Sequence, residues 1–315
     1  MLYEYVRKPD GSSEFLFVGS KCRELLELKE NDLLADAGLF WELVLAEDLQ
    51  RLKSEDASAN KEGISFLTEV RIQTNSGCLK WIELSARPNS AAAGEIVVWS
   101  GYMLDITERK KMEERVRQMA LYDTLTNLAN RRLFNDRLIQ AMSAIVRSGA
   151  YGAVIVLDLD HFKAINDAHG HLVGDALLVA AATRLKGCVR AMDTVGRFGG
   201  DEFVVMLSEL SADQAESKRQ ASEVAEKIRI ALAKPYMLTI HHAGQPDTQL
   251  ERRCTASLGV ILFSGKEVGP DDLIAEADAA MYLAKKAGRN QIRFSFVHEI
   301  EISHSKGIVV NASRV

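Results

Sequence analysis

The sequence predicts a protein of the α+β and α/β classes, with two domains joined by a helical connector. Its 315 residues are enough for about two domains of ordinary size. Short strand-like segments with small helices precede a stretch of dense mixed charge at 105–119. The apolar run 152–157 then begins a part rich in long helical patterns, and such a run is typical of a strand buried on both faces.

The composition is that of a globular protein, since 47% of the residues are hydrophobic and 26% are charged. The net charge of −5 disfavours nucleic acid as a partner, because a nucleic-acid-binding domain normally presents a basic face. The four cysteines lie far apart, which favours reduced thiols over disulfides or a zinc site. No apolar run approaches the roughly 18 residues that span a bilayer. We therefore expect no membrane span in this chain and a cytoplasmic location.

Residues 1–105 have the pattern of a small mixed domain. Strand-like alternation flanks a Pro-Asp-Gly turn near the start, and an Asn-Ser-Gly turn joins two later strands. The predicted elements are strands at 2–6 and 14–18, a helix at 20–28, a second helix with Glu47 and Asp48 in its first turn, and strands at 64–73, 79–85 and 95–104.

This order of elements, closed by Asp105-Ile106-Thr107, resembles a PAS sensory domain. The resemblance implies an antiparallel sheet with small helices, and a role in binding an unidentified small molecule or in dimerisation. No histidine precedes His161, so no haem is held by a histidine from residues 1–160. No asparagine–cysteine photoreceptor motif is present either, which disfavours a light-driven flavin adduct. The residues that we expect in the core or an interface are Cys22, Trp41, Trp81 and Trp99.

The predicted connector covers residues 106–122. Asp105 or Thr107 is suited to cap the start of a helix. One narrow apolar stripe follows it, formed by Ile106, Met112, Val116 and Met119. A solvated surface helix is one interpretation, and a short parallel coiled coil between sensor and effector is the favoured one. Two heptads are too short to dimerise alone, so we expect the flanking domains to contribute to a homodimer.

A hairpin with adjacent acidic residues is predicted at 196–207. Gly199 and Gly200 supply the positive φ angles that such a tight turn requires, and apolar β-formers follow. The neighbouring carboxylates of Asp201 and Glu202 repel each other, and a bound Mg²⁺ would offset this repulsion because hard cations take oxygen ligands. An ordinary glycine turn with solvated acids is the alternative.

Acidic residues also follow the buried strand 152–157. Asp158 and Asp160 come at its end, where carboxylates can point into one crevice. Together with Glu202 they can form an oxygen-rich site for one or two Mg²⁺ (or Mn²⁺) ions. Such a site is typical of nucleotidyl transfer, in which metal ions hold a triphosphate and stabilise the attacking and leaving oxygens.

Three sequence blocks, in this order, resemble the GGDEF family of diguanylate cyclases. The opening 123–132 is similar to DxLTGLxNRR, with Asn127 in place of the usual glycine. Asparagine also tolerates the left-handed conformation, so this departure is mild. The block 158–175 is similar to DLDxFKxIND…GHxxGD, and 199–203 is the GGDEF signature itself. The resemblance implies a ferredoxin-like, nucleotide-cyclase palm-like domain over 123–296.

The resemblance also assigns roles at the metal site. It implies that the Asp158 carboxylate, the Leu159 carbonyl and the Glu202 carboxylate hold the metal ions. Asp201 assists or orients the site, and Lys285 joins these residues in catalysis.

Substrate binding is assigned in the same way. Asn166 and Asp175 would read guanine, since a carboxylate accepts from its N1–H and N2–H₂ together; helix capping is the alternative for both residues. Backbone amides near His161 and Phe162 would cradle phosphates. The full set of expected substrate-binding residues is Asn166, Asp175, His161, Phe162, Lys285, Arg289, Gly199 and Gly200.

Two further patterns lie in the effector domain. Arg190 and Asp193 match the spacing and place of the family's RxxD inhibitory site, which predicts product binding there. His169 and His171 have the spacing of metal ligands, but we interpret them as packing or capping residues rather than zinc ligands.

The remaining elements of this domain are predicted from periodicity and turn residues. Residues 297–315 form a tail of unknown role, with a possible hairpin from 297–302 and 308–310. The expected elements are helices at 131–147, 176–190, 212–232 and 271–287, a polar hairpin extension at 247–253, and a strand at 254–260.

The sequence therefore predicts a diguanylate cyclase with a PAS sensor at 1–105, which condenses two GTP into cyclic di-GMP and two pyrophosphates. Two GTP-loaded domains must face each other, so dimer geometry is the expected control point. One alternative is a silent receptor for GTP or cyclic di-GMP that acts through protein contacts. A cyclase for another cyclic dinucleotide is a third possibility, which Asp175 disfavours because it suits guanine.

Overall fold

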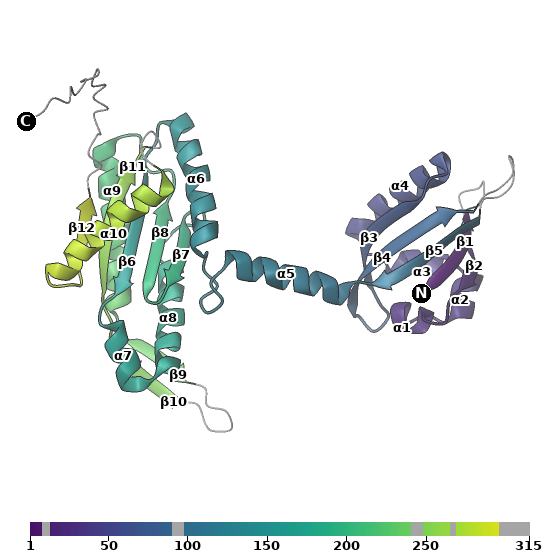
Figure 1. Ribbon diagram of the computed structural model, residues 1–315, viewed down its shortest axis with the longest axis horizontal. Coiled ribbons are helices and arrows are strands. Elements are labelled where there is room, and N and C mark those ends of the chain that lie inside the picture. The colour runs from purple at the N-terminus through teal and green to yellow at the C-terminus, as the bar shows by residue number, and fades with distance from the viewer. Residues whose placement is uncertain (8–12, 90–97, 241–247, 265–268, 296–315) are drawn as a thin grey trace, which may run out of the picture. The chain divides into compact units, whose positions relative to one another are not determined.

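The computed structural model describes residues 1–7, 13–89, 98–240, 248–264 and 269–295. It divides into two compact units, Met1–Arg117 and Gln118–Val315, which we describe separately (Figure 1). The predicted tail hairpin lies outside the described residues. Within the described part, none of the helices combines the length and apolarity needed to cross a membrane.

The first unit is an antiparallel sheet of five strands in the order β2-β1-β5-β4-β3, with four helices. This arrangement confirms the predicted PAS-like fold. The elements are β1 (Leu2–Arg7), β2 (Ser13–Val18), α1 (Cys22–Leu26), α2 (Glu30–Ala35), α3 (Gly38–Leu43), α4 (Ala46–Glu62), β3 (Phe66–Gln73), β4 (Leu79–Pro88) and β5 (Val98–Asp105).

The helical part of this unit differs from the prediction. The helix expected at 20–28 is shorter, because Glu27 adopts a left-handed conformation, with φ of 58°, and ends α1. The short helices α2 and α3, each six residues long, are absent from the elements predicted from the sequence. Elements this short carry little periodicity, and tertiary packing decides them.

The core of the first unit contains two of the four predicted residues. Cys22 and Trp99 have no exposed surface. Trp41 and Trp81 are half-buried instead, and each has a cation over its ring: Lys53 lies 5.8 Å from the Trp41 centroid and Lys110 lies 5.3 Å from the Trp81 centroid. Long side chains therefore cover a face of each of these two rings.

Helix α5 (Thr107–Leu121) begins with the predicted cap and crosses the division between the two units. The Thr107 amide donates to Asp105 Oδ1 over 2.9 Å, and the Trp81 amide donates to Thr107 Oγ1 over 3.0 Å. No residue of α5 is buried. Three residues of the predicted stripe are more than half exposed, at 55% for Met112, 58% for Val116 and 59% for Met119, whereas Ile106 precedes the helix and is buried. The chain described here offers this stripe no partner among its own described residues.

The second unit is built on a sheet of five strands in the order β12-β11-β6-β8-β7, in which only the β11–β12 pair is parallel. A separate hairpin, β9–β10, confirms the predicted extension. The elements are α6 (Arg131–Ser148), β6 (Gly152–Leu159), α7 (Phe162–His169), α8 (His171–Lys186), β7 (Thr194–Gly199), β8 (Glu202–Leu207), α9 (Gln214–Ala233), β9 (Tyr236–Ile240), β10 (Thr248–Arg252), β11 (Ala256–Phe263), α10 (Pro270–Lys286) and β12 (Ile292–Ser295).

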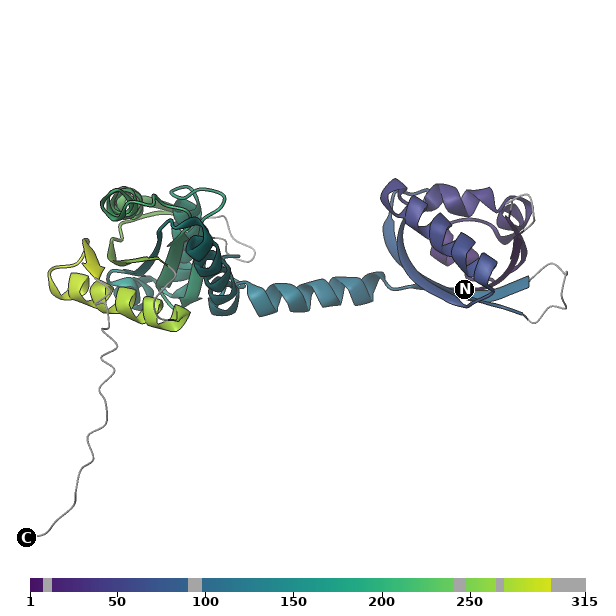
Figure 2. The ribbon, with the colours of Figure 1, turned by 90° about the horizontal axis from the view of Figure 1, so that it is seen from above.

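Strand β6 is central and every one of its residues is buried, as predicted. Its side chains alternate between two cores. Ile155 and Leu157 pack with residues of α8 and α9, and Val154 and Val156 pack with residues of α6 and α10. Figure 2 shows these helix pairs on opposite faces of the sheet. Because helices pack on both faces of the sheet, the position of the C-terminal end of β6 is fixed, and with it the position of the residues that follow the strand.

Helix α8 begins and ends before the predicted helix 176–190. Its N-cap is Gly170, with φ of 81°, and its C-cap is Gly187. Neither glycine provides a side-chain cap, so the start at His171 lacked the usual Ser, Thr or Asp signal. The other long helices, α6, α9 and α10, agree with the predicted spans to within about two residues, which is ordinary scatter at helix ends.

Candidate active site

The acidic hairpin lies beside the end of β6. Asp158 and Glu202 are direct partners in the antiparallel pairing of β6 and β8. The turn follows the predicted chemistry, since φ is 139° at Gly199 and 49° at Gly200, angles that favour glycine. The Leu159 amide donates to the Asp201 carbonyl over 3.3 Å, which joins the turn to the strand end.

Asp158 is the buried acid of this pair, with 8% of its surface exposed. Burial raises its pKa to about 6, although the hydrogen bond from Lys285 acts in the opposite direction. The Lys285 Nζ atom lies 2.8 Å from Asp158 Oδ2. The structure thus brings together Asp158, Glu202 and Lys285 from three elements. Asp158 and Lys285 are 127 residues apart in the sequence.

The donor set at this point suits a hard divalent cation. It consists of two carboxylates, from Asp158 and Glu202, and the nearby Leu159 carbonyl, all of them oxygen donors. The raised pKa of Asp158 indicates that this carboxylate lacks full compensation of its charge. Among the described residues, no group of three or more His, Cys, Asp or Glu side chains is gathered for a metal ion. The backbone carbonyl would have to complete such a set.

The predicted guanine residues lie on the helix pair α7–α8. Asn166 is inside α7 and its buried Oδ1 atom has no hydrogen-bond partner among the described residues. A Cβ atom at Gly174 would lie 1.8 Å from Asn166 Oδ1, so glycine is needed there for the asparagine to fit. Asp175 is exposed within α8. Neither Asn166 nor Asp175 caps a helix, which leaves the capping alternative without support.

The start of α7 supplies the predicted phosphate-side residues. His161 is its N-cap with φ of 60°, and Phe162, its first residue, is buried. At the other end of α7, Arg252 Nη2 lies 3.2 Å from His169 Nδ1. His171 is the first residue of α8 and is exposed. Both histidines are exposed at helix ends, and Gly170 rather than either histidine is the cap residue between α7 and α8, so their interpretation as packing or capping residues gains no support.

The predicted basic residues lie in the last turn of α10 and in the segment after it, where three residues have positive φ. Lys285 lies in the last turn of α10, and φ is 114° at Gly288, 62° at Arg289 and 45° at Asn290. The Arg289 amide donates to the Ala284 carbonyl over 3.1 Å. Lys285 therefore contacts Asp158 directly, whereas within the described part of the chain Arg289 makes no ion pair with Asp158 or Glu202.

Arg190 and Asp193, the predicted inhibitory pair, lie in one turn and are joined by a hydrogen bond. The Arg190 amide donates to Asp193 Oδ2 over 2.8 Å, and the Ser208 amide donates to Asp193 Oδ1 over 3.1 Å. A cavity of about 300 Å³ adjoins them and carries further basic residues, Arg137 and Lys186. The Asp193 carboxylate therefore stabilises the turn through two backbone amides, and the side chains of Arg137, Lys186 and Arg190 line the cavity.

The family models decide the classification. The model described as "Diguanylate cyclase, GGDEF domain" matches residues 120–291, which is more than half of the chain. The chain belongs to the GGDEF family. A second model, described as "PAS fold", matches residues 15–103. The GGDEF domain thus follows a PAS domain, in agreement with the expected architecture.

Relatives of the GGDEF domain carry both synthetic and degradative names. The bifunctional diguanylate cyclase/cyclic di-GMP phosphodiesterase MucR of Pseudomonas aeruginosa is 43% identical over 173 residues, which cover 55% of this chain and 23% of MucR. The diguanylate cyclase DgcM of Escherichia coli K12 is 35% identical over 213 residues, covering 66% of this chain and 48% of DgcM. The chain therefore spans less than half of either relative.

A solved structure supports the fold of the GGDEF domain. The crystal structure of the coiled coil and GGDEF domain of DgcB from Caulobacter crescentus, in complex with c-di-GMP, is 29% identical with a TM-score of 0.50. The match covers 60% of this chain and 93% of that one.

Sequence reasoning missed the contacts of two charged side chains that join distant segments of the GGDEF domain. Arg197 donates to both oxygens of Asp123, over 2.9 and 3.0 Å, and also to the Gly200 carbonyl over 2.7 Å. This pair joins the start of the domain to the signature turn. The buried carboxylate of Asp160 was predicted to join Asp158 and Glu202 in the metal site, but it accepts hydrogen bonds from Thr255, Ser257 and the Asn290 amide instead. Regular spacing gave no signal for either, because the partners lie far apart in the chain.

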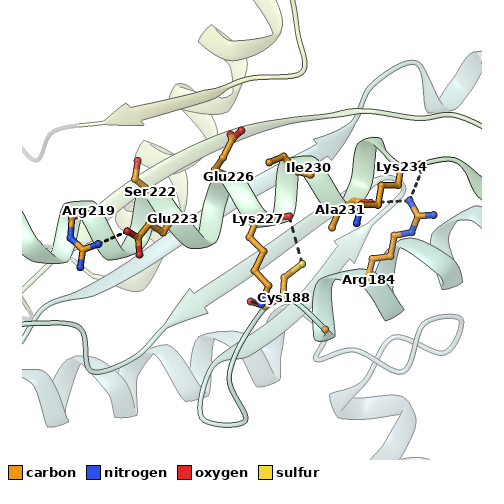
Figure 3. Close-up of a pocket in the computed structure, with 11 residues that line it drawn as sticks. Arg184, Cys188, Arg219, Ser222, Glu223, Glu226, Lys227, Ile230, Ala231 and Lys234 are labelled. Carbon is orange, nitrogen blue, oxygen red and sulfur yellow. Dashed lines mark hydrogen bonds and ion pairs between the residues drawn. The ribbon is translucent and has the colours of Figure 1, made fainter.

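A wide groove of about 840 Å³ lies away from these residues, along α9 and the end of α8 (Figure 3). Its charged side chains bond to neighbours: Arg219 pairs with Glu223, and Lys227 donates to the Cys188 carbonyl over 2.9 Å. None of the predicted site residues lines this groove, so it forms no part of the candidate site.

Proposed function

We propose that the protein is a diguanylate cyclase that condenses two molecules of GTP into cyclic di-GMP and two pyrophosphates. The observation that carries this proposal is the meeting of Asp158, Glu202 and Lys285 beside the signature turn. Relatives named diguanylate cyclase, such as DgcM, support the same reaction. The c-di-GMP complex of DgcB supports this class of nucleotide as a ligand.

In this proposal, residues 123–296 form the catalytic domain and hold one GTP. Asp158, the Leu159 carbonyl and Glu202 would hold Mg²⁺ or Mn²⁺, which when bound supplies charge stabilisation at the reacting phosphate. Asp201 would orient the turn. The Lys285 side chain, which pairs with Asp158 in the structure, would change partners and bind a triphosphate. Arg289 would add a second cation.

Guanine would bind at the α7–α8 pair. Asn166 Oδ1 has no hydrogen-bond partner within the ranges that the structure describes and, once the side-chain amide rotates away from Gly174, would accept from guanine's N–H groups; the exposed Asp175 carboxylate would accept from the same edge. Backbone amides at His161 and Phe162, with the open turn at Gly199 and Gly200, would approach the phosphates. Adenine offers no comparable pair of donors, so we propose GTP as the substrate.

The chain holds one such half-site, so the proposed reaction needs two copies facing each other. The exposed stripe of α5 supports this requirement, since burying Met112, Val116 and Met119 against a second copy removes apolar surface from water. We propose that residues 1–105 and the connector 106–122 set the geometry of the pair. Catalysis would then consist mainly of positioning and charge stabilisation.

The test is incubation of the purified chain with GTP and Mg²⁺, followed by chromatographic separation of the products. Cyclic di-GMP and pyrophosphate are the expected products, and both should disappear when Mg²⁺ is removed by a chelator. If a demonstrably dimeric sample binds GTP but yields no cyclic di-GMP, the protein is a receptor rather than a cyclase.

The pH dependence of metal binding is a further expectation. A proton and a metal ion compete for the Asp158 carboxylate, whose pKa is raised to about 6 by burial. The affinity for Mn²⁺, measured without nucleotide by electron paramagnetic resonance, should therefore fall as the pH falls through about 6. The Asp158→Asn variant should bind Mn²⁺ weakly at every pH. Equal affinities of the original protein at pH 7 and pH 5 would contradict the role of Asp158.

Product inhibition should depend on Arg190. The Arg190→Ala variant removes a guanidinium from the cavity beside Asp193, while Asp193 keeps its bonds to the backbone. Loss of a bidentate contact to guanine should raise the inhibition constant for cyclic di-GMP about tenfold or more. Arg147→Ala, at the exposed end of α6, is the control and should leave inhibition unchanged. Unaltered inhibition in Arg190→Ala would remove the regulatory site from the proposal.

A further inference from the structure

The carboxylate of Asp160 is the centre of a buried hydrogen-bond network. Only 4% of the Asp160 surface is exposed. Its Oδ1 atom accepts from the Ser257 hydroxyl over 2.7 Å. Its Oδ2 atom accepts from the Thr255 hydroxyl over 2.6 Å and from the Asn290 amide over 3.1 Å. Three donors thus occupy the carboxylate, which leaves it poorly placed to act as a metal ligand.

These donors come from separate parts of the domain. Thr255 directly precedes β11, Ser257 is the second residue of that strand, and Asn290 belongs to the turn after α10. The Asp160 amide also donates to the Thr255 carbonyl over 2.8 Å. The network therefore ties the end of β6 to β11 and to the turn that follows α10.

The turn needs such a tie because its backbone is unusual. Arg289 and Asn290 both adopt left-handed conformations, which are sparsely populated for residues other than glycine. The Asn290 side chain is held as well, since Arg229 Nη1 donates to Asn290 Oδ1 over 2.9 Å. A backbone of this kind persists only where its surroundings determine it, and the Asp160 carboxylate binds it from the side of the active site.

We propose that Asp160 is a positioning residue, which fixes the turn carrying Arg289, and with it the end of α10 carrying Lys285, relative to Asp158. This inference rests on the proposed function. Asp158 and Asp160 are two residues apart on one chain segment, so the acid at the reacting centre and the anchor of the cationic turn move together. Without the anchor, the two cations lose their defined distance from the site of the triphosphate.

The test is the dissociation constant of a non-hydrolysable GTP analogue with Mg²⁺, measured on the full chain by calorimetry beside kcat/KM. Asp160→Ala should raise this constant on the order of ten- to a hundredfold, since small misplacements of binding groups have effects of that size. Asp160→Asn should rescue most of the loss, because its side-chain oxygen can still accept from the Asn290 amide and Ser257 can reverse its hydroxyl. Glu223→Ala, an exposed acid on α9, is the control and should bind normally.

A double-mutant cycle separates positioning from a general loss of structure. In an Arg289→Ala background, Asp160→Ala should weaken binding by a smaller factor than it does in the original protein, because the contribution of Arg289 has already been removed. In an Asp175→Ala background the two losses should multiply. Equal multiplication in both backgrounds would overturn the proposal, as would normal analogue binding by a folded Asp160→Ala variant.

Two complications are covered by the same design. If Asp160→Ala does not fold, as judged by circular dichroism, the cycle is carried out with Thr255→Val, which removes a donor to Asp160 Oδ2, and a multiplicative loss there also overturns the proposal. Binding of the analogue without turnover by the original protein would contradict the cyclase function while still deciding the role of Asp160. No binding of the analogue by the original protein would refute both.

Discussion

Replacement of Glu202 by glutamine is expected to lower the rate of cyclic di-GMP formation on the order of a thousandfold, the size of a loss of several kcal/mol of charge stabilisation. Glutamine keeps the shape of the side chain and removes its charge. Glu202 is exposed at the start of β8, so the substitution should leave the fold intact. The measurement is the initial rate with saturating GTP and Mg²⁺.

The matched control is Glu223→Gln, which removes one exposed carboxylate from α9 in the same domain. This variant should retain full activity. Both variants should also show the same melting temperature as the original chain. Full activity of a folded Glu202→Gln variant would break the metal assignment and, with it, the main support for the cyclase function.

The largest expected effect on stability comes from Gly259→Ala in β11. A Cβ atom at this position would lie 1.9 Å from the Ala277 carbonyl oxygen and 2.3 Å from the Met281 amide nitrogen, both in α10. Backbone atoms of a helix, unlike the end of a flexible side chain, cannot move away individually, so α10 must shift as a whole. We expect a loss of about 3 kcal/mol in the free energy of unfolding, which corresponds to a fall of roughly 10 °C in melting temperature for a domain of this size.

The same shift should reduce activity, because α10 carries Lys285. Calorimetric melting and the rate of cyclic di-GMP formation are the two measurements. Gly187→Ala is the control, since φ there is −72° and the nearest atom to a Cβ would lie 3.5 Å away. An unchanged melting temperature for Gly259→Ala would mean that β11 and α10 pack less closely than described.

The parts of the fold that were predicted depend on local patterns. The buried strand β6 has a continuous apolar run, and the β7–β8 hairpin has glycines where its φ angles are positive. Helix α9 has an ordinary N-cap, Asp213, whose side chain accepts from the Glu216 amide over 2.8 Å. The start of α8 was missed because Gly170 offers no such signal. Local sequence patterns therefore predicted most elements. They failed where a helix begins without a side-chain cap, as α8 does at Gly170.

The site was predictable only as a set of residue types. The pairing of Asp158 with Glu202 follows from two strands that meet, and the sequence blocks indicated both residues. The bond between Lys285 and Asp158, and that between Arg197 and Asp123, join residues far apart in the chain. Such contacts arise from tertiary packing, which no spacing in the sequence expresses. The predicted roles of these residues remain to be tested by the variants above.

The ion pair between Lys285 and Asp158 gives the acidic end of β6 an internal counterion. A buried carboxylate of this kind would otherwise depend on an external cation to offset its desolvation. Because the chain provides that positive charge itself, folding of the domain is uncoupled from the supply of divalent ions. In the proposed function, a divalent ion would displace the Lys285 cation from Asp158, and the domain could be assembled before that ion binds.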